Sequence, residues 1–187
     1  MSVEHAEKNY SILQITMNLA AACFISGAII SAVYFITAPV AAQKAVIMKN
    51  DAMKALVKNA EAFKPMQDKK DWYTAVKSGK TIAYIVPSES KGFGGAIKML
   101  VAVTPDGKVI DFNILAHNET PGLGSNAANY PFRKQFKGKQ SADLEVTKDP
   151  SNTKDIQAMT GATISSRAVT KGVKEAVDEV VQYAGGK

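Results

Sequence analysis

The sequence predicts an α+β protein, in which a single N-terminal transmembrane helix precedes a domain whose mostly antiparallel sheet is flanked by helices. An uncharged apolar run lies near the N-terminus of the 187-residue chain, strand-like segments with turn signals fill its middle, and helical patterns lie on both sides of them. We therefore expect an N-terminal segment at 1–11, a transmembrane helix at 12–38, an amphipathic connecting helix at 39–64 and a folded domain at 65–187.

The uncharged run from Ile12 to Ala38 is long enough to cross a bilayer, because its roughly 27 residues would extend about 40 Å as a helix. Polar and small residues such as Gln14, Asn18 and Gly27 interrupt it, and such residues favour close packing against other helices. We therefore expect this anchor to dock against partner membrane subunits. A cleavable signal peptide fits less well, because the run is long and a proline follows its last alanine.

The segment 40–63 has apolar residues near helical spacing, with lysines between them. This pattern predicts the connecting helix, which is compatible with a role as the first core helix of the domain. Pro65 and the charged run 68–71 would end it.

Strands are expected in the middle of the chain. Residues 72–86 indicate short strands around a turn at 78–80, and residues 87–90 are expected to form a loop. The segments 96–103 and 108–115 predict a hairpin, because the Thr-Pro-Asp-Gly sequence between them is a strong turn signal.

Glycines cluster at 92–95, where we expect a loop or bulge that leads into a strand. Residues 144–147 are consistent with a further short strand. From Ser165 onward, apolar residues recur at spacings of three and four, which predicts a helix with Ser165 or Ser166 as its N-cap.

Composition excludes several classes of function. The net charge of +6 comes from scattered lysines without a basic stripe, so nucleic-acid binding is not expected. The single cysteine, Cys23, permits no disulfide within the chain, and the two histidines form no cluster with metal-ligand spacing. We expect neither a metal site nor a catalytic residue of the acid–base type.

Two motifs carry most of the functional information. Glu-Thr-Pro-Gly-Leu-Gly at 119–124 forms a rigid loop after a strand. His117 beside Glu119 suggests proton transfer only weakly. Thr-Gly-Ala-Thr at 160–163 lies at or just before a helix N-terminus, a position that suits a phosphate, although the spacing by itself favours a simple capped helix start.

Both motifs, in this order, resemble those of the FMN-binding-domain family, which includes the G subunits of Rnf electron-transport complexes and the C subunits of sodium-pumping NADH:quinone reductases. The resemblance covers about residues 91–181. In that family a flavin transferase uses FAD to attach FMN through a phosphoester bond to the last threonine of the second motif, which implies attachment at Thr163. The chain departs from the family pattern at Gln157, where an acidic residue is usual.

The resemblance further implies which residues surround the flavin, with Leu123 against the isoalloxazine ring. The implied cofactor-binding residues are Thr160, Gly161, Ala162, Thr163, Ser165, Glu119, Thr120, Leu123 and Gly124.

The compact region between anchor and domain is more similar to that of the Rnf subunits. This implies an electron-carrier subunit, without a substrate of its own, of a membrane complex that moves electrons between ferredoxin and NAD and translocates Na⁺ or H⁺. The alternatives are the C subunit of a sodium-pumping quinone reductase, a stand-alone membrane flavoprotein that feeds an extracytoplasmic reductase, and a non-redox anchored scaffold.

Two signals disagree on orientation. Lys44, Lys49 and Lys54 follow the span and Lys8 alone precedes it, so the positive-inside rule places the C-terminal domain in the cytoplasm. The resemblance implies the opposite, a cytoplasmic N-terminus with the domain on the extracytoplasmic side of the cytoplasmic membrane. We favour the second orientation, because partner subunits can fix the topology of a single span.

Overall fold

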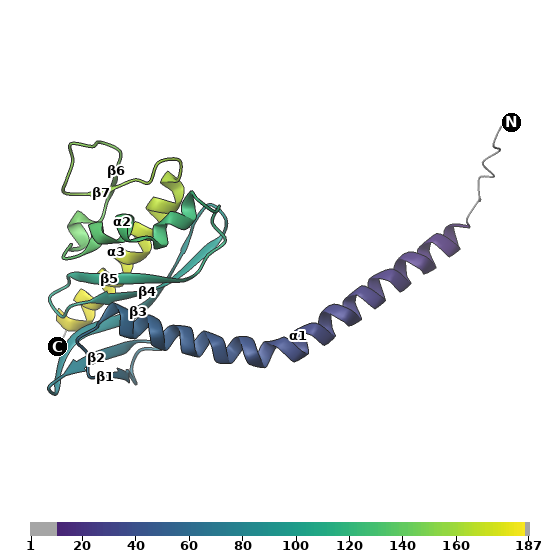
Figure 1. Ribbon diagram of the computed structural model, residues 1–187, viewed down its shortest axis with the longest axis horizontal. Coiled ribbons are helices and arrows are strands. Elements are labelled where there is room, and N and C mark those ends of the chain that lie inside the picture. Colours follow the sequence, from purple (N-terminus) through teal and green to yellow (C-terminus); the bar gives the residue numbers. More distant parts are fainter. Residues whose placement is uncertain (1–10, 186–187) are drawn as a thin grey trace. The chain divides into compact units, whose positions relative to one another are not determined.

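The computed structural model describes residues 11–185. Residues 1–10 and 186–187 lie outside the described range, and with them all but the last residue of the cytoplasmic N-terminal segment expected at 1–11. The chain divides into two compact units, with the boundary after Ile47. Helix α1, Ile12–Leu56, contributes to both units, and the sheet and the remaining helices belong to the second (Figure 1).

The N-terminal part of α1 is uncharged, and its large apolar side chains are exposed. Phe24, Ile29 and Phe35 are 79%, 60% and 83% exposed. Within the described residues, α1 is the one helix long and apolar enough to cross a membrane, judged by length and composition. Burying such a helix in lipid removes the cost of holding these side chains in water.

The predicted connecting helix at 39–64 is not a separate element. Helix α1 continues through Pro39 to Leu56, and β1, Ala62–Pro65, begins six residues later. Phe63, which fits the helical spacing, instead pairs with Ala75 of the next strand. An apolar residue just beyond a helix satisfies the same spacing as one inside it, so the sequence pattern overestimates the length of this helix.

The second unit is built on a five-stranded sheet in which every neighbouring pair is antiparallel, in the order β1-β2-β3-β4-β5. The remaining strands are β2 (Tyr73–Lys77), β3 (Lys80–Lys91), β4 (Ala96–Val103) and β5 (Val109–Ala116). Both predicted turns are present, and Gly79 and Gly107 adopt φ values of +75° and +78° that suit glycine.

The predicted loop at 87–90 is wrong, because β3 runs through it to Lys91 and pairs with β4 throughout. The strand pairing explains why Pro87 is tolerated in β3. Strand β2 accompanies β3 only as far as Ile85, so Pro87 lies where β3 has a single neighbour and its missing N–H leaves no gap in a two-sided ladder.

Each face of the sheet has its own apolar core. On one face, Val101, Phe112 and other strand residues pack against Val173 and Val177 of α3, Thr163–Gly185, the yellow helix in Figure 1. On the other face, the last turns of α1 cover the sheet. The residues of α1 buried there are Ala52, Met53 and Leu56.

Between β5 and α3 the chain forms short elements: η1 (Gly124–Ala128), α2 (Tyr130–Arg133), η2 (Lys134–Phe136), η3 (Ser141–Asp143), and the parallel pair β6 (Val146–Thr147) and β7 (Ile156–Gln157). Phe132 and Phe136 pack together in the core with their ring centroids 5.2 Å apart. Strand β6 corresponds to the strand expected at 144–147.

Neither Ser165 nor Ser166 is an N-cap, because α3 already begins at Thr163 and both serines lie inside its first turns. The Ser166 hydroxyl donates to the Ala162 carbonyl at 2.9 Å. Both serines are buried, at 2% and 0% exposed. The Ser165 hydroxyl bonds Glu119, whereas Ser166 Oγ accepts the Met159 N–H at 3.0 Å and so ties the preceding turn to the helix.

Candidate flavin site

A tight turn delivers the Thr-Gly-Ala-Thr motif to the start of α3. Gly161 adopts φ +74°, and the Ala162 N–H donates to the Met159 carbonyl at 3.1 Å. Ser166 donates its N–H to the Ala162 carbonyl at 2.9 Å. The amides of the first helical residues, starting with Thr163, precede that bond, so helix geometry leaves them available to an anion. Thr163 itself is half-buried.

The glycine cluster lies directly against the Glu-Thr-Pro-Gly-Leu-Gly motif. The Gly94 N–H donates to Glu119 Oε1 at 2.8 Å. A Cβ atom at Gly94 would lie 1.9 Å from the Asn118 carbonyl oxygen, so no other residue fits without movement of the backbone. Here glycine permits close approach of two loops, which is one of its established uses.

Glu119 ties three segments together from a buried position, with 5% of the residue exposed. One carboxylate oxygen accepts the Gly94 N–H, and the other accepts the Ser165 hydroxyl. The Glu119 N–H donates to His117 Nδ1 at 3.1 Å. Its carboxylate is thus occupied by hydrogen bonds that hold the glycine loop to α3.

The pKa of Glu119 reflects this arrangement. Burial by itself raises the pKa, but hydrogen bonds from the Ser165 hydroxyl and from the backbone N–H groups of Gly94 and Phe93 outweigh it. The pKa therefore lies below its ordinary value, and the group is a carboxylate at neutral pH. A carboxylate held in this way supports structure and is a poor proton donor.

The two motifs touch through their glycines. A Cβ atom at Gly124 would lie 2.5 Å from Ser165 Oγ and 2.6 Å from Glu119 Oε2. A Cβ atom at Gly161 would lie 3.2 Å from Leu123 Cδ2. The sequence places these motifs about 40 residues apart, and the fold packs them into one surface.

That surface encloses a cavity of about 430 Å³. Its lining residues are Phe93, Glu119, Thr120, Leu123, Gly124, Lys148, Gly161, Ala162, Thr163, Ile164 and Ser165. All the residues implied by the resemblance are therefore brought together, except one. Thr160 lines a neighbouring cavity with Gln157 and Met159.

Three lining residues were missed from the sequence: Phe93, Lys148 and Ile164. Phe93 and Ile164 are 71% and 56% exposed, and together with the exposed Leu123 they give the cavity an apolar wall of the kind that marks ligand-binding grooves. An aromatic residue inside a glycine cluster was the available signal for Phe93. No local pattern distinguishes Lys148 from the other lysines.

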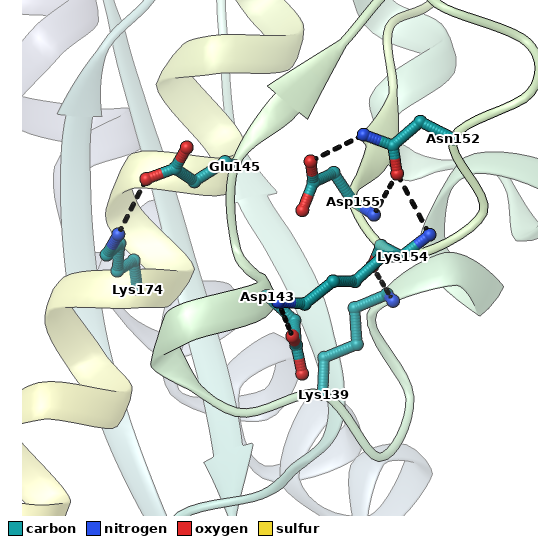
Figure 2. A network of polar contacts seen from close by, with 7 residues as sticks. All are labelled: Lys139, Asp143, Glu145, Asn152, Lys154, Asp155 and Lys174. Atoms are coloured by element: carbon teal, nitrogen blue, oxygen red, sulfur yellow. Dashed lines mark hydrogen bonds and ion pairs between the residues drawn. The ribbon is translucent and has the colours of Figure 1, made fainter.

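Lys148 belongs to the loop between β6 and β7, which is organised by its own polar side chains (Figure 2). Asn152 donates to Asp155 Oδ2 at 2.7 Å and accepts N–H groups of Lys154 and Asp155. An ion pair of 3.5 Å joins Lys154 to Asp143. A further ion pair, of 3.6 Å, joins Lys174 of α3 to Glu145.

The Gln157 side chain closes this loop through two hydrogen bonds. Its side-chain amide donates to the carbonyls of Asp149 at 2.6 Å and Asn152 at 2.7 Å. A carboxylate cannot donate either bond. The departure from the family pattern at this position therefore matches the way this chain closes its loop.

The fold and the cavity together define a class: an α+β domain with a cavity of small-molecule size, preceded by a long apolar helix. A family model, the FMN-binding domain, matches residues 92–178, which include both motifs and the glycine loop. The chain resembles the crystal structure of NqrC from Shewanella oneidensis, with a TM-score of 0.52, 21% identity and coverage of 70% of this chain and 73% of that one. At this identity the likeness concerns the fold alone.

Curated relatives give the particular family. The chain is 66% identical over 177 residues to the G subunit of the proton-translocating ferredoxin:NAD(+) oxidoreductase complex of Clostridium ljungdahlii, covering 95% of this chain and 96% of the relative. It is 32% identical to the G subunit of the ion-translocating oxidoreductase complex of Methanosarcina acetivorans, covering 73% and 77%. The chain belongs to the family of G subunits of ion-translocating oxidoreductase complexes. Such membership and α1 together indicate a membrane protein.

The residues of the cavity fit FMN. Its volume lies in the range of about 300–1,000 Å³ typical of small-molecule sites. Phe93, Leu123 and Ile164 offer exposed apolar surface to a flat ring. Lys148 and the N-terminus of α3 offer positive charge and N–H donors to a phosphate group.

Proposed function

We propose that this chain is the flavin-bearing electron carrier of a membrane-bound ferredoxin:NAD⁺ oxidoreductase complex, with FMN esterified to Thr163. The observation that carries the proposal is the position of Thr163, which begins α3 and lines a cavity with both apolar and cationic walls. The same observation disfavours a mere helix cap, because a cap requires neither the cavity nor the exposed apolar residues around it.

Attachment is a phosphoryl transfer in which the hydroxyl of Thr163 is the nucleophile. Thr163 Oγ1 forms a bond to the flavin-side phosphorus of FAD, the pyrophosphate bond breaks, AMP leaves and the hydroxyl proton is released to solvent. No oxidant or reductant is needed. The amides at the start of α3 and Lys148 bind the phosphate oxygens, which favours attack by holding the reacting atoms together.

The bound flavin supplies reversible electron transfer, and the chain's residues determine its position. Phe93 and Leu123 exclude water from the ring, and the ester keeps the cofactor bound throughout turnover. Glu119 holds the glycine loop against α3 and takes no part in proton transfer. We therefore expect no substrate of its own for this subunit.

We further propose that α1 spans the cytoplasmic membrane once and that the domain lies on its extracytoplasmic side. The family implies partners of two kinds: the other membrane and redox subunits of the complex, and a flavin transferase for maturation. Protease added to intact spheroplasts tests the orientation, since an extracytoplasmic domain is degraded and a cytoplasmic one is protected.

The proposal is tested by the intact mass of the protein after co-expression with a flavin transferase. A mass increase equal to FMN less one water, mapped to the peptide containing Thr163, is expected. Thr163→Ala should lose the increase while the domain still folds, whereas Thr153→Ala, which removes an exposed hydroxyl from the preceding loop, should retain it. Flavin that stays covalently bound in Thr163→Ala would refute the assignment.

A further inference from the structure

A second cavity, of about 500 Å³, shares no lining residue with the flavin cavity. It lies where the end of α1 meets strands β3 and β5 and the segment formed by α2 and η2. The lining residues are Ala55, Leu56, Val57, Lys58, Asn59, Ile82, Ile110, Asp111, Tyr130, Arg133, Lys134 and Lys137. The proposed flavin chemistry uses none of them.

The charged residues that line this cavity are mostly cationic. Four cations line it against a single carboxylate, Asp111. Arg133 is fixed by that carboxylate, with its Nε 3.2 Å from Asp111 Oδ1. Lys58, Lys134 and Lys137 make no ion pair with any described residue. Three exposed ammonium groups are thus left for an external anion.

The walls of the cavity are apolar and aromatic. Leu56 and Val57 are buried, whereas the ring of Tyr130 stands at the edge with 75% of the residue exposed. Tyrosine and arginine are the residues most enriched where protein partners bind, particularly around a small apolar centre. A rim of lysines around such a centre suits a peptide segment that carries acidic side chains beside an apolar one.

We infer that this basic groove, defined by Lys58, Tyr130, Arg133, Lys134 and Lys137, binds an acidic segment of another subunit of the complex. Membership of a multi-subunit complex favours a protein segment over a membrane surface, and the charge of the groove sets the sign of that segment. The inference rests on family membership and is independent of how the flavin is attached.

The groove is also connected to the flavin cavity through the chain. Helix α2 begins two residues after η1, whose first residue, Gly124, lines the flavin cavity. Phe132 and Phe136 of the same segment are buried in the domain core. A partner bound at the groove would therefore contact a segment that begins six residues after Gly124 and is anchored in the domain core.

The test uses the assembled complex with an affinity tag on another subunit. The double variant Lys134→Glu/Lys137→Glu should lower the amount of this subunit retained by about tenfold at moderate salt. The matched control is Lys77→Glu/Lys80→Glu, which reverses the charge of two exposed lysines at the β2–β3 turn. The tagged complex should retain this variant as fully as the wild-type subunit. Equal retention of the double variant and wild type would overturn the inference.

Two further measurements separate the explanations. Covalent flavin on the released double variant, seen by fluorescence in a denaturing gel, shows that the domain folded and that the flavin proposal stands by itself. The amount of the double variant retained by the tagged complex is then compared with wild type in nanodiscs of neutral and of anionic phospholipid. Release in both supports a protein partner; release confined to anionic discs would assign the groove to lipid headgroups and overturn the inference.

Discussion

The flavin cavity has two sides that differ in what their residues do. The support side comprises Gly94, Glu119 and Ser165, which are joined by hydrogen bonds: the buried Glu119 accepts the N–H of the exposed Gly94 and the hydroxyl of the buried Ser165. The contact side comprises Phe93, Leu123, Lys148 and Thr163, which face the cavity and are half-buried or exposed. The difference teaches that the shape of the site depends on hydrogen bonds within the protein as well as on the side chains that face the cavity.

This division separates two measurable quantities. Substitutions on the support side should lower the free energy of unfolding and, as a consequence, weaken flavin binding. Substitutions on the contact side should weaken flavin attachment and leave the free energy of unfolding nearly unchanged. Trp72, which is 4% exposed and the single tryptophan of the chain, reports unfolding by fluorescence in every variant.

The largest effect is expected for Gly94→Ala. The added Cβ would overlap the Asn118 carbonyl, so the glycine loop and the Glu-Thr-Pro-Gly-Leu-Gly motif must move apart. We expect a loss of about 3 kcal/mol or more in the free energy of unfolding, measured by urea denaturation, together with loss of flavin attachment. The control is Gly122→Ala, where a Cβ meets open space and only the φ of +75° is unfavourable. That variant should lose about 1 kcal/mol; similar losses in both would contradict the role of close approach.

Glu119→Ala should have the next largest effect. It leaves the buried Ser165 hydroxyl and the Gly94 N–H without their acceptor, at a cost of about 2–3 kcal/mol in the free energy of unfolding. Urea denaturation measures this cost. Thr120→Ala, next in sequence but on the cavity wall, should cost far less. Equal losses of unfolding free energy in the two variants would contradict the distinction between the support side and the contact side.

A smaller effect concerns how the free energy of unfolding depends on pH. Because the pKa of folded Glu119 lies below its ordinary value of 4.5, the carboxylate stabilises the fold above that pH, and the stabilisation is lost as pH falls through the folded pKa. Glu119→Gln carries no proton equilibrium at this position. The gap in unfolding free energy between wild type and this variant should therefore narrow as pH falls from about 6 to below 4.5. A gap independent of pH would show that the charge of Glu119 contributes nothing.

Local sequence patterns predicted the sheet and its turns better than the contacts within the flavin cavity. The antiparallel sheet and the turns at Gly79 and Gly107 follow from short-range signals. Ser165 was expected to be a helix cap because capping is a local rule, but its hydroxyl bonds Glu119, 46 residues away in sequence. Lys148 was missed for the same reason, since only the packed fold brings its loop to the cavity.

The smallest effect on stability is expected for Lys148→Gln, on the contact side. Lys148 is exposed, so its removal should change the free energy of unfolding by less than about 0.5 kcal/mol. Its charge should matter for attachment, because it lines the cavity where the phosphate is proposed to bind. We expect the rate of flavin transfer, followed by covalent fluorescence over time, to fall by about fivefold at low salt, since an exposed ion pair contributes up to about 1 kcal/mol.

Salt distinguishes this charge effect from a change of shape. Added salt screens exposed charges, so the wild-type rate should approach that of Lys148→Gln as ionic strength rises. The matched control is Lys154→Gln in the same loop, whose ammonium pairs with Asp143 at 3.5 Å and does not line the cavity. Its rate should equal that of wild type at every salt concentration. If both lysine variants slow attachment equally, the loop acts as a whole and Lys148 has no separate role on the contact side.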